Sequence, residues 1–145
     1  MTRINCVDPL VLEDSFLLAE HREIKRIPNQ LLSKGYNPSL YSKPKEYVLG
    51  KGHVTFFFDK LIYLYQRYQN LHYECLHRGF AVSWLWPEDW IFLDYNLKNN
   101  WTPSSKDQET NIERLISNID KKEKVRYRRE NIDREKMKFI TKYII

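Results

Sequence analysis

The chain has 145 residues, of which 42% are hydrophobic and 14% aromatic, so its size and composition are those of one folded domain rather than a disordered segment. Its net charge is +5, no apolar stretch approaches the ~20 residues that span a bilayer, and the first residues are too charged for a signal peptide. The two cysteines make neither a disulfide framework nor a four-ligand zinc site, so we expect a cytoplasmic, intracellular protein without metal or cofactor.

The first predicted element is a helix that opens at Asp8-Pro9 and ends near Lys34-Gly35. Asp8 suits the N-cap position and Pro9 the first helical position. Pro28 is expected either to kink this helix or to mark where it breaks. Its apolar stripe, at near-helical spacing, comprises Leu10, Leu17, Ile24, Ile27 and Leu31.

The second predicted helix runs from about Val54 to Arg78, after a loop over 36–53 that contains prolines and glycines. Gly79 stands where a helix commonly ends. This is the longest periodic segment of the chain. Its apolar face comprises Phe57, Leu61, Leu64, Tyr68, Leu71 and Cys75.

Residues 80–103 hold all four tryptophans, and we expect a short helix from Pro87 within a loop. Core packing is one role for these rings, and stacking on an extruded base is another. A third helix follows, with Ser105 and Gln108 at capping-box spacing. Its core stripe comprises Ile112, Leu115, Ile116 and Ile119.

These elements predict an all-α fold over residues 1–145, a single compact domain of three main helices with long connecting loops. No strand pattern competes with the helices. The chain ends in a basic stretch at 121–145, and its first part, KKEKVRYRR (121–129), has six basic residues and one acidic residue. Basic side chains with Tyr127 among them suit a segment that contacts a phosphate backbone and stacks an aromatic ring on a base. The alternative is that this stretch is the solvated end of a helix.

The opening residues MTRIN place a small residue, Thr2, after Met1, and a methionine in that position is normally removed. Thr2 would then carry the α-amine, whose pKa is ~7.7–8.0 against ~10.4 for a lysine side chain. At about pH 7.5 roughly a third of such an amine is neutral, so Thr2 can act as an amine nucleophile without a pKa lowered by burial. Because many proteins start with Met-Thr, this pattern alone does not establish the role.

Two further clusters each allow a structural and a functional interpretation. AEHREIKR (19–26) places Arg22 and Arg26 one helical turn apart with Glu23 beside them. The structural interpretation is a salt-bridged helix surface. The functional interpretation is that Glu23 is a general acid/base held among phosphate-binding arginines. LGKGHVTFFFDK (49–60) has two glycines before a long helix, which is weak evidence for phosphate binding. For its His53, packing at the start of the helix is favoured over contact with a ligand.

Together these motifs resemble the pyrimidine-dimer DNA glycosylase/AP lyase family, the phage-type endonuclease V. The resemblance rests on MTRIN at the start, AExRExxR from Ala19 and LGxGHVTFFxDK from Leu49, in that order and at the family's spacing. It continues in RGF (78–80), NWTP (100–103) and the Arg114-Leu115 pair.

The resemblance implies a DNA repair enzyme that excises UV-induced cyclobutane pyrimidine dimers from double-stranded DNA and cuts abasic DNA as a lyase. Thr2 is then the nucleophile that forms a Schiff base with the opened sugar, and Glu23 assists proton transfer and β-elimination. The residues matched to DNA contacts are Arg3, Arg22, Arg26, Arg114, Tyr127 and Arg128. No cofactor is implied, and a monomer is expected.

Two departures from the family pattern bear on lesion preference. The family's aromatic run, similar to WYKYYG, is replaced by the more basic VRYRREN (125–131), and the basic residue expected one turn after Arg114 is Asn118. Two alternatives therefore stay open. One is an AP lyase or glycosylase with another lesion preference, and the other is a non-catalytic DNA-binding module of the same fold.

Overall fold

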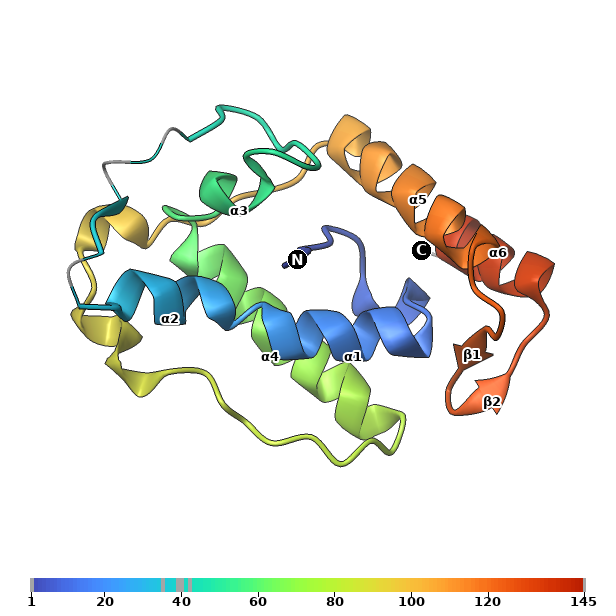
Figure 1. The fold of residues 1–145 in the computed structure, drawn as a ribbon. Coiled ribbons are helices and arrows are strands. Elements are labelled where there is room, and N and C mark those ends of the chain that lie inside the picture. The colour runs from blue at the N-terminus through green and yellow to red at the C-terminus, as the bar shows by residue number, and fades with distance from the viewer. Residues whose placement is uncertain (1, 35, 39–40, 42, 145) are drawn as a thin grey trace.

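The computed structural model describes residues 2–34, 36–38, 41 and 43–144, and it is helical apart from one small hairpin (Figure 1). The all-α prediction is confirmed. The helices are α1 (Asp14–Glu23), α2 (Arg26–Leu32), α3 (His53–Phe56), α4 (Leu61–His77), α5 (Ser105–Asp120) and α6 (Arg134–Tyr143). The 3-10 helices are η1 (Pro9–Val11), η3 (Glu88–Phe92) and η4 (Tyr95–Leu97), and the antiparallel strands are β1 (Arg126–Tyr127) and β2 (Glu130–Asn131).

The N-terminal coil, residues 2–8, runs through the middle of the molecule, with α1, α3, α4 and α5 around it (Figure 1). Around this coil, α1 packs on α4 and α5 packs on α6. Ile4, Cys6 and Val7 of the coil belong to the core and are at most 4% exposed. Since the core forms around the coil, the first residues of the chain are held by several elements at once.

The first predicted helix is three elements, η1, α1 and α2, rather than one helix that opens at Asp8. Asp8 caps only η1, whereas Glu13 caps α1. Pro28 does break the helix, but the break falls at Ile24, four residues earlier. Proline lacks the N–H that would bond the Ile24 carbonyl, and its ring clashes with that carbonyl. The helix ends at Leu32, and Gly35 of the predicted end lies outside the described residues.

The second predicted helix is also interrupted, because α3 and α4 are separated by the turn 57–60. Phe56, Phe57 and Phe58 are all at most 1% exposed. Successive residues of a helix are about 100° apart, so three consecutive side chains cannot all point into one core from a continuous helix. The turn lets all three enter it. The predicted face of this segment is confirmed, since its six residues are each 0% exposed: Phe57, Leu61, Leu64, Tyr68, Leu71 and Cys75.

The C-terminal third contains structure that the sequence did not predict. The capping box of α5 is Ser104 with Asp107, one residue before the predicted pair. The hairpin β1–β2 turns at Arg128 and Arg129, which both have positive φ without being glycine. The tail forms α6, which packs on α5 through a buried Met137. The short helix expected from Pro87 is present as η3.

Candidate active site

The backbone of Ile4 is held on both sides by side chains from the 47–53 segment. Its N–H donates to His53 Nε2 at 2.9 Å, and its carbonyl accepts from the Tyr47 hydroxyl at 3.3 Å. His53 Nδ1 lies 2.8 Å from the Val48 carbonyl, so Nδ1 carries the proton and Nε2 is free to accept. Burial lowers the pKa of His53, which keeps the ring neutral. His53 therefore fixes the coil, in agreement with the packing role favoured from the sequence.

Gly52 is required where this segment turns toward the coil. Its φ is +89°, and a Cβ at this position would lie 2.7 Å from Pro44 Cγ. Both the backbone conformation and the close approach exclude a larger side chain. The glycine-rich motif is thus explained by the turn that brings His53 under Ile4.

Asn5 is the centre of a buried hydrogen-bond network that occupies both carboxylate oxygens of Glu20. The Asn5 N–H and Nδ2 donate to Glu20 Oε2 and Oε1 at 3.2 and 2.8 Å. Arg67 binds the same two oxygens, at 2.8 Å from Nε and 3.0 Å from the second guanidinium nitrogen. On the other side, Asn111 donates to Asn5 Oδ1 at 2.7 Å and accepts from the Cys6 N–H at 2.7 Å. The Glu20 side chain is 1% exposed, so both of its oxygens are occupied by protein donors.

Glu23 lies three residues further along α1, in a different setting. It lines a cavity of about 280 Å³ between the coil, α1 and α5. The side chains around this cavity are Arg3, Asn5, Phe16, Ala19, Glu20, Glu23, Arg114, Leu115 and Asn118. The Glu23 side chain is 14% exposed, and its carboxylate contacts only Arg22 at 3.4 Å and Arg26 at 4.0 Å among the described residues. Glu23 is thus the carboxylate in this cavity that is open to a ligand.

Arginines from four elements lie beside this carboxylate or line its cavity. Arg22 and Arg26 are 62% and 53% exposed at the side chain and flank it on α1 and α2. Arg3 and Arg114 approach from the coil and from α5. Burial, followed by the nearby charge of Arg3, lowers the pKa of Arg114, which as an arginine still remains ionised. Two guanidinium groups beside an open carboxylate, with two more on the lining of the same cavity, favour a ligand that carries several negative charges.

The structure brings together most of the site residues predicted from the sequence. Arg3, Glu23 and Arg114 share the cavity, with Arg22 and Arg26 at its edge. Thr2 is 9% exposed and directly precedes Arg3, but its side chain is not among those that line the cavity. The sequence missed Asn5, Asn111 and Arg67. Asn5 ends the MTRIN motif, which assigns it no role of its own, and Asn111 and Arg67 belong to no motif.

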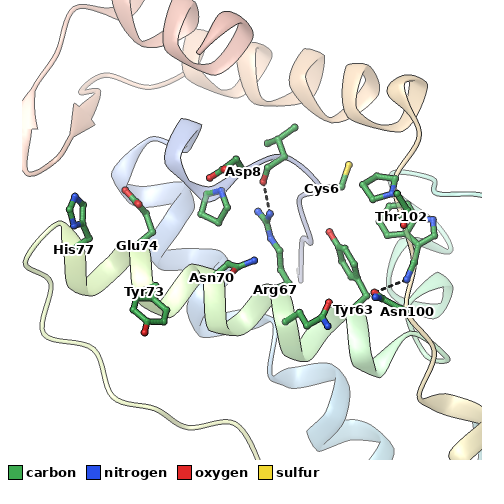
Figure 2. Close-up of a pocket in the computed structure, with 15 residues that line it drawn as sticks. Cys6, Asp8, Tyr63, Arg67, Asn70, Tyr73, Glu74, His77, Asn100 and Thr102 are labelled. Carbon is green, nitrogen blue, oxygen red and sulfur yellow. Dashed lines mark hydrogen bonds between the residues drawn. The ribbon is translucent and has the colours of Figure 1, made fainter. Parts of the chain in front are cut away.

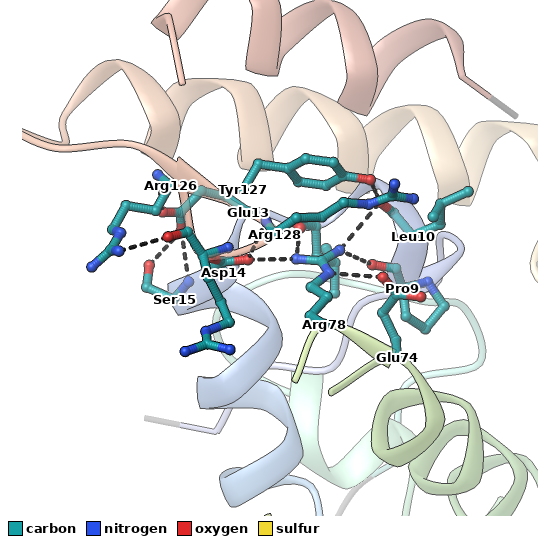
Figure 3. A network of polar contacts seen from close by, with 12 residues as sticks. Pro9, Leu10, Glu13, Asp14, Ser15, Glu74, Arg78, Arg126, Tyr127 and Arg128 are labelled. Atoms are coloured by element: carbon teal, nitrogen blue, oxygen red, sulfur yellow. Dashed lines mark hydrogen bonds and ion pairs between the residues drawn. The ribbon is translucent and has the colours of Figure 1, made fainter. Parts of the chain in front are cut away.

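Tyr127 and Arg128 lie on the hairpin (Figure 3), and neither of them lines the Glu23 cavity. The Tyr127 hydroxyl donates to the Leu10 carbonyl at 2.7 Å, so this ring is tied back to the protein. The Arg128 backbone N–H donates to Asp14 at 3.0 Å, while its side chain is exposed. Of the two, only Arg128 has an exposed side chain, and its guanidinium lies 5.4 Å from the centre of the Tyr127 ring.

Arg78 joins the hairpin to α1 and α4 at the centre of Figure 3. Its side chain is 0% exposed and pairs with Asp14 at 2.9 Å and Glu74 at 2.7 Å. It also donates to the carbonyls of Pro9, Leu10 and Leu12 and lies 4.6 Å from the centre of the Tyr127 ring. The arginine of the RGF motif is thus a structural residue, and the motif stabilises the fold rather than contacting a ligand.

A larger cavity, of about 860 Å³, opens on the α4 side of the coil (Figure 2). Its lining is mostly amides, hydroxyls and aromatic rings, among them Gln66, Asn70, Tyr73, Asn100 and Trp101. Arg67 reaches across it to the Val7 carbonyl, but its charge is already paired with Glu20. Glu23 and the surrounding arginines do not line this cavity, so we assign the candidate active site to the smaller one.

Neither a metal centre nor a membrane span is found in the part of the chain that the structure describes. No three His, Cys, Asp or Glu side chains gather there as a possible ion site. No described helix combines the length and apolar character needed to cross a membrane. Cys6 and Cys75 are buried free thiols, and burial raises the pKa of Cys6 to about 12, so neither is a reactive nucleophile.

An all-α fold with an open carboxylate among arginines defines a protein whose site suits a phosphate-bearing ligand. A family model described as pyrimidine dimer DNA glycosylase matches residues 1–88, more than half of the chain. The chain therefore belongs to the pyrimidine dimer DNA glycosylase family, which makes DNA its substrate and DNA repair its role. The match includes Thr2, Arg3 and Glu23 but ends before α5, so Arg114 and the hairpin lie outside it.

We expect His53→Ala to lower the free energy of unfolding by about 2–4 kcal/mol, because it leaves a cavity and removes the partners of the buried Ile4 N–H and the part-buried Val48 carbonyl. His53→Gln keeps an oxygen that can accept from the Ile4 N–H, and it should lose about half as much. Urea unfolding of both variants beside the wild type measures the difference. Equal losses would show that ring volume, not the hydrogen bond to Ile4, is what matters.

The contribution of His53 should also depend on pH. The folded protein has a lowered His53 pKa, whereas the unfolded chain protonates this ring near ~6.5. Its contribution is then fully present above about pH 6.5 and declines as the pH falls from there toward the lowered folded value. Wild-type stability should therefore fall more steeply than that of His53→Gln between about pH 6.5 and 5, as measured by urea midpoints.

Proposed function

We propose that this glycosylase excises cyclobutane pyrimidine dimers and then cleaves the strand as an AP lyase, through a Schiff base on the Thr2 amine. The proposal rests on the contrast on α1: both oxygens of Glu20 are bound by Asn5 and Arg67, while Glu23 is open and flanked by Arg22 and Arg26. A site for acid/base chemistry on DNA needs this second kind of carboxylate.

The first step uses the α-amine of Thr2 once Met1 is removed. The neutral amine attacks the anomeric carbon of the damaged nucleotide and the bond from that carbon to the base breaks. The departing base gains the proton that the attacking nitrogen releases. Ring opening of the sugar then gives a Schiff base. An α-amine with a pKa of ~7.7–8.0 is suited to this step, because part of it is neutral near pH 7.5 while the resulting imine is easily protonated.

The second step needs a group that moves protons, and Glu23 is our candidate. Its carboxylate takes a proton from the carbon next to the imine, and β-elimination expels the phosphate on the 3′ side. Arg22, Arg26, Arg3 and Arg114 would bind the phosphates that flank the lesion. Their charges would also lower the cost of bringing an ionised Glu23 close to a polyanion.

Borohydride trapping of protein that begins at Thr2 tests the proposal on three duplexes: one with a thymine dimer, one with an abasic site and one undamaged. We expect a covalent adduct with the first two duplexes and none with the third. The control is the same chain with Met1 retained, whose Thr2 nitrogen is in a peptide bond, and we expect it to give no adduct. If only the abasic duplex is trapped, the protein is a lyase without dimer glycosylase activity. If neither the dimer duplex nor the abasic duplex is trapped, the result favours a non-catalytic DNA-binding module.

Arg22→Ala and Arg26→Ala should each weaken DNA binding and flatten its salt dependence. A lost phosphate contact lowers the slope of log affinity against log salt by about one unit. Lys98→Ala is a matched control, since the Lys98 ammonium is held by the Ile91 carbonyl at 2.6 Å. Binding isotherms at several salt concentrations give the slopes, and an unchanged slope for both arginine variants would mean that they do not contact DNA.

A further inference from the structure

The segment 84–97 presents large apolar side chains to solvent. Leu85 and Ile91 are 57% and 59% exposed, Phe92 is 79% exposed and Tyr95 is 85% exposed. Five of the eleven exposed large hydrophobic residues in the described chain fall between 84 and 95. Single exposed apolar residues are ordinary, but a concentration of this kind commonly marks a surface of interaction.

This segment is firmly attached to the rest of the molecule. The Trp90 ring stacks on Tyr65 at 4.8 Å, and Trp86 is only 4% exposed. Asp94 caps η4 by accepting from the Asn96 N–H at 2.8 Å. The outward side chains are therefore presented from a fixed backbone, which lowers the entropy lost on binding.

The charge of the segment is opposite to that of the whole chain. Residues 79–97 contain three acidic side chains, Glu88, Asp89 and Asp94, and no lysine or arginine, in a protein of net charge +5. Lys98 follows and its ammonium binds the Ile91 carbonyl, which leaves the surface net acidic. Within the described part of the chain, the carboxylates of Glu88 and Asp89 have no hydrogen-bond or ion-pair partner. Unpaired carboxylates repel the phosphates of DNA, so this surface is unsuited to the substrate.

The position of the segment agrees with its charge. In Figure 1 it runs along the side of α2 and α4 and lies at the opposite end of the molecule from α5, α6 and the basic hairpin. A protein bound there would leave the Glu23 cavity and the hairpin free for DNA.

We propose that this surface, formed by Leu85, Glu88, Asp89, Ile91, Phe92, Asp94 and Tyr95, docks a segment of another protein that carries apolar side chains flanked by lysine or arginine. The apolar groups supply the buried contact, with Phe92 and Tyr95 as its centre. The carboxylates at the edge select a cationic partner and speed its approach. This inference is independent of the Schiff-base chemistry proposed above.

The test uses two synthetic helical peptides of equal length, one built from leucine and arginine and one from leucine and glutamate. Amide chemical shifts and the fluorescence of the nearby tryptophans report binding and its location. The leucine–arginine peptide should bind at 84–97 and the leucine–glutamate peptide should not. Phe92→Ser/Tyr95→Ser should weaken binding by about tenfold or more, and Glu88→Gln/Asp89→Asn should weaken it mainly at low salt.

Phe139→Ser/Tyr143→Ser on α6 is the matched control, because these rings are 56% and 59% exposed on another element. It should leave peptide binding unchanged, and Phe92→Ser/Tyr95→Ser should leave cleavage of protein-free DNA unchanged. Peptide binding that is insensitive to Phe92→Ser/Tyr95→Ser would overturn the proposal. The proposal would also be overturned if the wild type formed a concentration-dependent dimer that Phe92→Ser/Tyr95→Ser abolished. That result would assign the surface to a second copy of this chain. Loss of binding to phosphatidylglycerol vesicles in that variant would assign it to a membrane and would also overturn the proposal.

Discussion

Glu23→Gln is expected to remove at least about 99% of strand cleavage, a loss of ~10²–10⁴-fold, while DNA affinity stays within about threefold of the wild type. Glutamine has the shape of glutamate and keeps an oxygen toward Arg22 and Arg26, so the site retains its geometry. It cannot take up a proton at neutral pH, and the elimination step then lacks its base. Removing a negative charge near DNA also leaves no electrostatic reason for weaker binding.

The measurement pairs single-turnover cleavage of the dimer and abasic duplexes with fluorescence anisotropy for affinity. Glu109→Gln, at an exposed position on α5, is the control for a lost carboxylate outside the cavity. Equal losses of cleavage and affinity in Glu23→Gln would contradict the acid/base role, because they would mean that Glu23 only organises the DNA-binding arginines. Borohydride trapping of the variant separates the steps, since an adduct that forms without cleavage assigns Glu23 to elimination.

The helical faces of this protein could be predicted because each depends on a local period. The buried side of α4 follows from spacing within a single segment, and all six predicted residues are in the core. The breaks could not be placed in the same way. The end of α1 at Ile24 is imposed from Pro28, one turn later, and the turn before α4 exists because three adjacent phenylalanines enter one core.

The hairpin shows the same limit at longer range. Arg128 and Arg129 adopt positive φ, which sequence patterns associate with glycine or asparagine. Their backbone N–H groups donate to the two oxygens of Asp14, at 3.0 and 2.8 Å, from more than 100 residues away in the chain. The buried Arg78 holds Asp14 in place. No local pattern contains this information, so the sequence predicts a basic stretch with a tyrosine inside it but not the hairpin.

For the candidate site too, some features could be predicted from local sequence and others depend on residues far away in the chain. In the sequence, Glu20 and Glu23 are near neighbours in the same motif, and only the resemblance to the family assigns the acid/base role to Glu23. The structure distinguishes them through Arg67, 47 residues from Glu20, and through Asn5, which comes from the coil. A residue's availability for catalysis depends on which of its atoms already have partners, and those partners come from elsewhere in the chain.

Glu20→Gln, the same substitution three residues earlier, should therefore affect stability rather than chemistry. It leaves the Arg67 guanidinium, 6% exposed, without its counter-charge, and it turns one acceptor into a donor that faces Arg67 or Asn5. Breaking a buried pair from one side typically costs about 3–5 kcal/mol. We expect a loss of this size in urea unfolding of Glu20→Gln, against less than about 0.5 kcal/mol for Glu23→Gln, whose side chain is partly exposed.

The two variants together test whether the coil is held by its network. At a temperature where Glu20→Gln is still folded, its cleavage rate should fall by far less than that of Glu23→Gln, because Glu23 and the arginines around it are intact. A Glu20→Gln protein as stable as the wild type would mean that Asn111, His53 and Tyr47 suffice to fix the coil. A stable Glu20→Gln protein that is also inactive would place Glu20 in the chemistry, and the division of roles on α1 would then be wrong.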